Sequence, residues 1–177
     1  MKATSLVCAA LLGTFAPVAR AADTPPTDPQ IAAIVVTANQ VDVDAGNLAK
    51  ERSKTKDVQD FALRMVTDHT GVNKQASDLV AKLGVKPEPN PTSESLKKGG
   101  EENLAKLEKL SGSAFDKAYV DHEVAYHEQV LDAVDKTLIP NASNAELKAL
   151  LEKSRPVFAS HLEHAKRLQA DLAKSGG

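Results

Sequence analysis

Residues 58–83 read VQDFALRMVTDHTGVNKQASDLVAKL, and this stretch decides the fold class. Its apolar side chains recur every three or four positions, which is the spacing of one face of an α-helix. They are Val58, Phe61, Ala62, Met65, Val66, Val72, Ala76, Leu79, Val80 and Leu83. Gly84 ends the pattern, and Pro87, Pro89 and Pro91 follow as a stiff linker. The stretch predicts one long amphipathic helix with a single buried face.

The same spacing predicts further helices on both sides of this stretch. On the N-terminal side, Asp28 and Pro29 are suited to serve as the cap and the first-turn proline of a helix from about Gln30 to Arg52. On the C-terminal side, Ser113 can cap a helix that Pro140 should stop. Each of these segments has one apolar face, so each needs partners against which to bury it.

The last segment and a weaker one complete the predicted architecture. Either Ser143 or Asn144 can cap a last long helix, and Pro156 lies inside its apolar pattern, where a proline kinks a helix. Residues 93–110 contain few apolar side chains and a Gly-Gly pair, which is typical of a short peripheral crossover helix. We therefore predict an all-α fold, an antiparallel four-helix bundle with one short extra crossover helix.

The N-terminus indicates export. Lys2 precedes a mostly apolar run at residues 6–18, and Ala19-Arg20-Ala21 then forms a small-x-small cleavage pattern, as in a secretory signal peptide cut after Ala21. The run is shorter than the roughly 20 residues that cross a bilayer, which argues against a stable transmembrane anchor after cleavage. Cys8 lacks the small neighbour that a lipoprotein signal requires. These features predict a periplasmic protein, with peripheral association with the envelope left open.

Length and charge bound the rest of the chain. We predict a signal peptide at residues 1–21, a disordered leader at 22–29 and a single domain at 30–175. Removal of the signal peptide leaves 20 basic and 24 acidic side chains without a long basic run, so no nucleic-acid partner is expected. Tryptophan is absent, and the few aromatic residues do not suggest a platform for stacking bases or sugars.

Five polar residues fall on or beside the predicted buried faces near the middle of their helices. His69, His127 and His161 each lie close to a helix midpoint, Asp42 is near the middle of the first helix, and Glu123 is one turn before His127. Midpoints meet when helices pack antiparallel, so we expect these side chains to converge in one layer. Neutral imidazoles and carboxylates are ligands for zinc, copper, iron and manganese. The layer therefore predicts a site for one transition-metal ion.

The alternative is that each histidine is a core residue whose hydrogen bonds are satisfied by a tyrosine, a carboxylate or another histidine. The hydroxyls of Tyr119 and Tyr126 are candidates for such bonds. His122 and His164 flank the layer and are interpreted as structural. Asp68, at the edge of the apolar face, is interpreted as a solvated helix residue rather than a ligand or a proton acceptor.

Several motifs resemble the DUF4142 family of exported, ferritin-like bacterial proteins, often labelled membrane or outer-membrane proteins. They are Met-Val-Thr-Asp-His-Thr at 65–70, Ala-Phe-Asp-Lys-Ala-Tyr-Val at 114–120, His127, Arg155-Pro156, and His-Leu-Glu-His-Ala at 161–165. The resemblance covers about residues 30–172 and implies a ferritin-like bundle in the periplasm, in a family without an established activity. The histidines that match are His69, His127 and His161.

Two classes of function remain open on the sequence alone. The first is a metal-binding bundle that uses His69, His127 and His161 with Asp42 or Glu123. The second is a non-enzymatic envelope or stress protein that binds an unknown protein or envelope partner, with structural histidines. An enzyme is the least supported class, because the paired Glu-x-x-His motifs of ferritin-like di-iron enzymes, a nucleophile motif and a phosphate-binding loop are all missing from the sequence.

Overall fold

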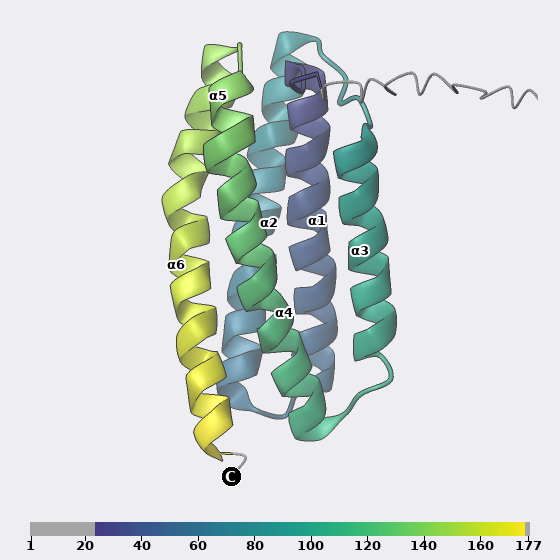
Figure 1. Cartoon of the computed structure of the whole chain (residues 1–177), viewed down its shortest axis with the longest axis vertical. Helices are drawn as coiled ribbons and strands as arrows, with labels where there is room; N and C mark the ends of the chain where they lie inside the picture. The colour runs from purple at the N-terminus through teal and green to yellow at the C-terminus, as the bar shows by residue number, and fades with distance from the viewer. Residues whose placement is uncertain (1–23, 176–177) are drawn as a thin grey trace, which may run out of the picture.

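The computed structural model describes residues 24–175, and every regular element within that range is helical (Figure 1). The elements are α1 (Asp28–Arg52), α2 (Lys56–Leu83), α3 (Pro91–Leu107), α4 (Gly112–Ala133), the π-helical turn η1 (Val134–Leu138), α5 (Ile139–Asn141) and α6 (Ala145–Ser175). The predicted all-α class is confirmed. The predicted signal peptide at 1–21 lies outside the described residues.

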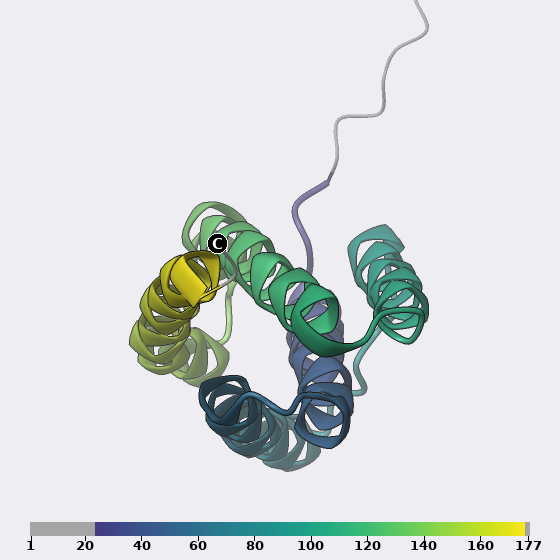
Figure 2. The same cartoon turned by 90° about the horizontal axis from the view of Figure 1, so that it is seen from below.

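Four long helices surround a common interior, and the fifth lies outside it. Seen end-on, α1, α2, α6 and α4 follow one another around a ring, while α3 packs on the outer side of α1 (Figure 2). Because α3 returns the chain from one end of the molecule to the other, each long helix runs antiparallel to both of its neighbours in the ring (Figure 1). This arrangement is compatible with the predicted four-helix bundle with a crossover helix.

The helix starts lie within a few residues of the predicted positions, but two caps differ. Thr27, not Asp28, is the N-cap of α1, and Ser111, not Ser113, is the N-cap of α4. Asp28 instead accepts hydrogen bonds from the backbone N–H groups of Ser143 and Asn144, both at 2.9 Å, and so ties the start of α1 to the start of α6. Carboxylates suit this position because they face unpaired N–H groups at both helix starts.

The caps of the other helices follow from ordinary side-chain chemistry. Of the two candidates for the last helix, Asn144 is the cap, because its Oδ1 accepts from the N–H groups of Glu146 and Leu147. Asn90 caps α3 in the same way, so this helix begins at Pro91 and ends at Leu107 rather than spanning 93–110. Gly84 ends α2 with a φ of 64°, in the left-handed region that glycine adopts without strain.

Pro140 does not stop the fourth helix, contrary to the prediction. The helix widens into η1 at Val134–Leu138 and continues through Pro140 to Asn141. A proline in a regular α-helix clashes with the carbonyl four residues earlier, and a π-helical turn at that place changes the register of the carbonyls. Pro156, in contrast, lies inside α6 as expected.

Two apolar clusters fill the two ends of the interior. The aromatic cluster consists of Ala45, Ala49, Val58, Phe61, Ala62, Met65, Leu107, Phe115, Tyr119, Val120, Ala165 and Leu168. The aliphatic cluster, nearer α5, consists of Ile31, Ile34, Val35, Val72, Ala76, Val134, Leu138, Ala142, Leu147, Leu151 and Phe158. No helix in the described part of the chain is long and apolar enough to span a membrane.

Candidate metal centre

A polar layer separates the two apolar clusters. On α2, His69 lies between Met65 of the aromatic cluster and Val72 of the aliphatic cluster. The same alternation places Asn39 and Asp42 on α1, Glu123 and His127 on α4, and His161 on α6 between the clusters. All six residues are buried, each with no more than 2% of its surface exposed. The polar layer is therefore sealed from solvent by apolar side chains at both ends.

The tautomer of His69 is fixed by its neighbour on α1. The amide nitrogen of Asn39 donates to the backbone carbonyl of Val35 at 2.8 Å, and so Asn39 Oδ1 faces His69. This oxygen lies 2.7 Å from His69 Nδ1. Because an amide oxygen only accepts, Nδ1 must carry the proton and donate it. His69 Nε2 is left with a lone pair.

The other two rings are fixed in the same manner. His127 Nδ1 donates to the backbone carbonyl of Glu123 at 3.0 Å, and His161 Nε2 donates to the carboxylate of Asp68 at 2.8 Å. Both partners only accept hydrogen bonds, so His127 Nε2 and His161 Nδ1 keep their lone pairs. These two atoms and His69 Nε2, which we call the lone-pair nitrogens, are buried and have no hydrogen-bond partner within the described residues.

The three rings form a compact triangle. Their centroids are 5.5 Å apart for His69 and His127, 5.1 Å for His69 and His161, and 5.5 Å for His127 and His161. The ring planes are inclined by 47° to 83° rather than stacked on one another. One ring nitrogen of each histidine lies within 4.8 Å of one from each of the others. The arrangement can hold a metal ion between the rings.

Two carboxyl groups lie against one side of this triangle. Asp42, Glu123 and His127 form a second group whose ligand atoms are within 4.8 Å of one another. Burial raises the pKa of Glu123 to about 8, and burial together with the nearby Glu123 raises the pKa of Asp42 well above its usual range. Two adjacent buried carboxylates repel each other, so the metal-free protein holds protons here at neutral pH.

Burial has the opposite effect on the histidines, because it disfavours a cation. It lowers the pKa of His127 to about 4, with a further contribution from His161. It also lowers the pKa of His69 well below the usual range, and that of His161, although Asp68 opposes the shift at His161. All three imidazoles are therefore neutral at pH 7, the form in which a histidine binds a metal ion.

Comparison with known proteins gives a family but no activity. Residues 14–168 match the family described as Domain of unknown function (DUF4142). The chain belongs to this family. No similar protein was found among the curated proteins, and none among the solved structures. The function of this DUF4142 protein must therefore be argued from its own residues.

The structure brings together the predicted histidines and both predicted carboxylates. Asp42 lies deeper than expected, since the sequence placed it near the boundary of the buried face. His122 and His164 lie outside the polar layer, where His122 stacks on Tyr126 and His164 meets the ring of Phe61 edge-on.

Two interpretations of residues around the histidines need correction, and one residue was missed. Asp68 is not merely solvated, because its carboxylate is the proton acceptor of His161. The hydroxyl of Tyr126 does not bond a histidine but donates to the carbonyl of Ala38 at 3.1 Å. Asn39 was missed, although it lies three residues before Asp42 on the same helical face, a spacing that could have revealed it.

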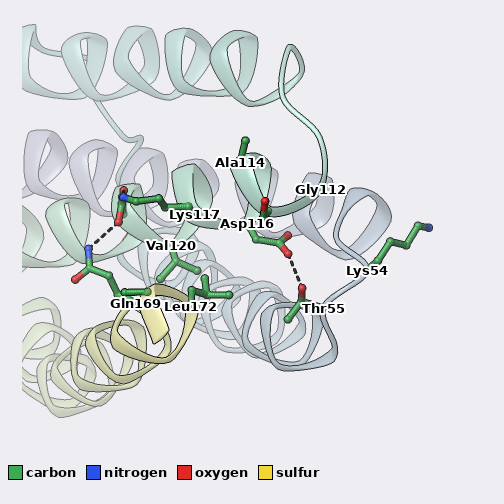
Figure 3. Close-up of a pocket in the computed structure, with 12 residues that line it drawn as sticks. Lys54, Thr55, Gly112, Ala114, Asp116, Lys117, Val120, Gln169 and Leu172 are labelled. Carbon is green, nitrogen blue, oxygen red and sulfur yellow. Dashed lines mark hydrogen bonds and ion pairs between the residues drawn. The ribbon is translucent and has the colours of Figure 1, made fainter. Parts of the chain in front are cut away.

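A hollow of about 570 Å³ on the DUF4142 chain lies away from these groups, at the end where α1 turns into α2 (Figure 3). Its polar side chains tie helices to one another: Thr55 donates to Asp116 at 2.5 Å, and Gln169 donates to Asp121 at 2.8 Å. The size of a hollow usually favours it as a binding site. Here the converging ligand atoms favour the polar layer instead.

Proposed function

We propose that this protein is an exported, ferritin-like four-helix bundle that binds one divalent transition-metal ion in its polar layer. The ligands are the lone-pair nitrogens of His69, His127 and His161, and Asp42 and Glu123 lie beside them. The observation that carries the proposal is that the tautomer of each ring is fixed. In each histidine one ring nitrogen donates to an oxygen acceptor, so the other ring nitrogen keeps a free lone pair. Such outer partners orient the histidine ligands of metal sites.

The same observation argues against histidines that serve only as core residues. A buried nitrogen that loses water without gaining a partner costs about 1–3 kcal/mol. Three such atoms in one layer of the described structure would be a large penalty for a protein domain, whose total stability is about 5–15 kcal/mol. A bound ion removes that penalty because it accepts all three lone pairs.

The spacing of the rings fits tetrahedral coordination. With metal–nitrogen bonds of about 2.0–2.1 Å, each ring centroid lies about 3.2 Å from the ion, and tetrahedral angles then separate the centroids by about 5.2 Å. The observed separations are 5.1–5.5 Å. The spacing of the rings is therefore compatible with an ion bound between them.

Charge compensation supports a divalent ion. A buried charge is stable only when it is paired, and three neutral imidazoles supply no charge. When Asp42 and Glu123 release their protons they provide two negative charges next to a dication, which leaves the buried layer neutral as a whole. The donor set of imidazoles and carboxylates suits zinc, copper, iron and manganese.

The proposal does not extend to a di-iron enzyme. Ferritin-like di-iron sites use Glu-x-x-His pairs on two helices with a glutamate on each of the other two. Here α2 and α6 contribute histidines to the polar layer, α1 contributes Asp42, and Glu123 and His127 on α4 are four residues apart. A mononuclear centre with histidine ligands from three helices fits this pattern.

The proposed compartment is the periplasm, on the basis of the signal sequence at residues 1–21. Expression of the full chain in a Gram-negative host, followed by fractionation and N-terminal sequencing, tests it. We expect the periplasmic protein to begin at Ala22. An uncut chain in the cytoplasm would contradict export without bearing on the metal centre.

Metal binding is tested by elemental analysis of the purified protein and by reconstitution of the metal-free protein with zinc(II) or cobalt(II). We expect one ion per chain and a rise in melting temperature that a chelator reverses. His69→Gln and His161→Gln should abolish binding, whereas His164→Gln, at a histidine outside the polar layer, is the matched control and should bind normally. Substoichiometric binding with an unchanged melting temperature would refute the centre.

A further inference from the structure

The aliphatic cluster contains a cavity next to the histidines. Its volume is about 30 Å³, and all four long helices and η1 contribute to its wall. Most of the wall is aliphatic and includes Val35, Val72, Val130, Val134 and Leu151. The end nearest the polar layer is formed by Asp42 and His69, with the ring of Phe158 stacked on His69 at 5.3 Å.

A π-helical turn forms part of the cavity wall. Val134 and Leu138 belong to η1, so the wall on that side is built on a widened π-helical turn instead of a regular α-helix. Such turns change where side chains point and are frequent at functional sites. The aromatic cluster is built on regular helices, and its residues do not line this cavity.

The size and polarity of the cavity select its occupant. About 10–15 Å³ of such space holds one water molecule, so there is room here for about two waters or one diatomic molecule. A stable buried water needs two to four polar partners. The polar side chains in the wall are those of Asn39, Asp42, His69 and Ser154, and Asn39 already uses its nitrogen on Val35 and its oxygen on His69. The other nine residues of the wall are apolar. The aliphatic part therefore favours a small uncharged molecule over water or an anion.

The cavity also shares part of its wall with the polar layer, through Asn39, Asp42 and His69. Catalytic metal sites with three protein ligands keep a further position for an exogenous ligand. His69 belongs both to the cavity wall and to the histidine triangle, so a molecule in the cavity lies beside the place of the ion. We propose that the cavity admits a small uncharged diatomic molecule, such as nitric oxide or dioxygen, to the metal ion. This inference rests on the proposed function.

A test of the cavity that needs no metal uses xenon, an apolar probe. Xenon binding to the metal-free protein is followed by the shifts of methyl resonances in NMR spectra. We expect shifts confined to the wall residues, such as Val72 and Val134. Val130→Phe should fill the cavity and remove these shifts, and Val36→Phe is the matched control, because Val36 is an equally half-buried valine outside the wall. Shifts that are absent in the wild type, or that persist in Val130→Phe, would overturn the cavity.

The second test adds iron(II) and nitric oxide, whose complex has a characteristic electron paramagnetic resonance signal. We expect Val130→Phe to bind iron normally but to form this complex at least tenfold more slowly than the wild type and Val36→Phe. Val134→Met serves if Val130→Phe does not fold. Normal iron binding with unchanged nitric oxide rates would overturn this inference alone. Xenon binding without iron binding would overturn the proposed metal centre, and the ligand's access to it as well.

Discussion

The two ends of the bundle interior are built differently. The aromatic cluster packs Phe61 edge-on against Tyr119, with ring centroids 6.1 Å apart, and Tyr119 against Phe115 at 6.5 Å, all on regular helices. The aliphatic cluster is bounded by η1 and contains the cavity. Close packing maximises apolar burial and dispersion, whereas a cavity gives up part of both. The difference suggests that one end mainly stabilises the fold and the other leaves room beside the polar layer.

The largest effect on stability is expected from the aromatic cluster. Phe61→Ala removes a side chain with 0% exposure and should lower the free energy of unfolding by about 3–5 kcal/mol. Urea unfolding of the metal-free protein measures this change. Leu63→Ala, at an exposed apolar residue on the same helix, is the control and should cost less than about 0.5 kcal/mol. Equal costs at the two positions would contradict a stabilising role for the aromatic cluster.

The next effect concerns the polar layer rather than either apolar end. Asp68→Ala removes the acceptor that holds His161, and should weaken metal binding by about 10–100-fold because the ring loses its orientation and basicity. Titration with zinc(II) against a competing chelator measures the affinity. Asp60→Ala, at an exposed aspartate eight residues earlier on α2, controls for loss of surface charge. An affinity as high as that of the wild type would remove Asp68 from the proposed centre.

Asp68 marks a limit of what the sequence predicts about the candidate metal centre. The period of the apolar positions predicted the long helices and the depth of His69, His127 and His161, because burial and helical geometry are both encoded locally. The partner of His161 lies 93 residues away and on another helix, so only the packing of α2 against α6 brings it there. Side-chain hydrogen bonds between helices depend on rotations that a hydrophobic pattern does not specify.

The π-helical turn marks another limit of sequence-based prediction. Pro140 predicts a break because it cannot donate a backbone hydrogen bond, but the chain can also change its hydrogen-bond register just before it. Which outcome occurs depends on what the following residues pack against, and Val134 and Leu138 are both buried in the aliphatic cluster. Tertiary burial thus overrides the local signal. The cavity, whose wall includes Val134 and Leu138 of this turn, could not be inferred from the sequence either.

A matched pair of small-to-large substitutions compares the two ends directly. Ala49→Val adds two methyl groups within the aromatic cluster, where Ala49 is 0% exposed, and should cost about 1–3 kcal/mol because nothing there can give way. Ala38→Val makes the same change at the cavity wall and should cost less than about 1 kcal/mol, since the space is present. Thermal unfolding of the metal-free variants measures both. A greater loss at Ala38 would reverse the proposed contrast in packing.

The smallest effect is a pH dependence that comes from the polar layer alone. Glu123 keeps its proton in the folded protein up to a pKa of about 8, whereas in the unfolded chain its pKa is near 4.5. The folded state therefore binds more protons between these values, and its stability falls as the pH rises through 8. The histidines have lowered pKa values, so their contribution to the stability of the folded state is lost at acidic pH instead, as the pH falls from 6.5 towards 4.

The window from pH 7.5 to 9 separates the two contributions, because the histidines are already neutral there in both states. Across it the metal-free protein should lose on the order of 1 kcal/mol or less of unfolding free energy. Glu123→Gln, which mimics the protonated acid, should lose less, because Asp42 is then the one carboxyl group of the pair that can still ionise. A bound dication should also abolish the loss, because it stabilises the ionised carboxylates. Urea unfolding at several pH values measures these differences. Parallel profiles for the wild type and Glu123→Gln would mean that burial does not raise the pKa of Glu123, and the pH dependence assigned to this residue would then be wrong.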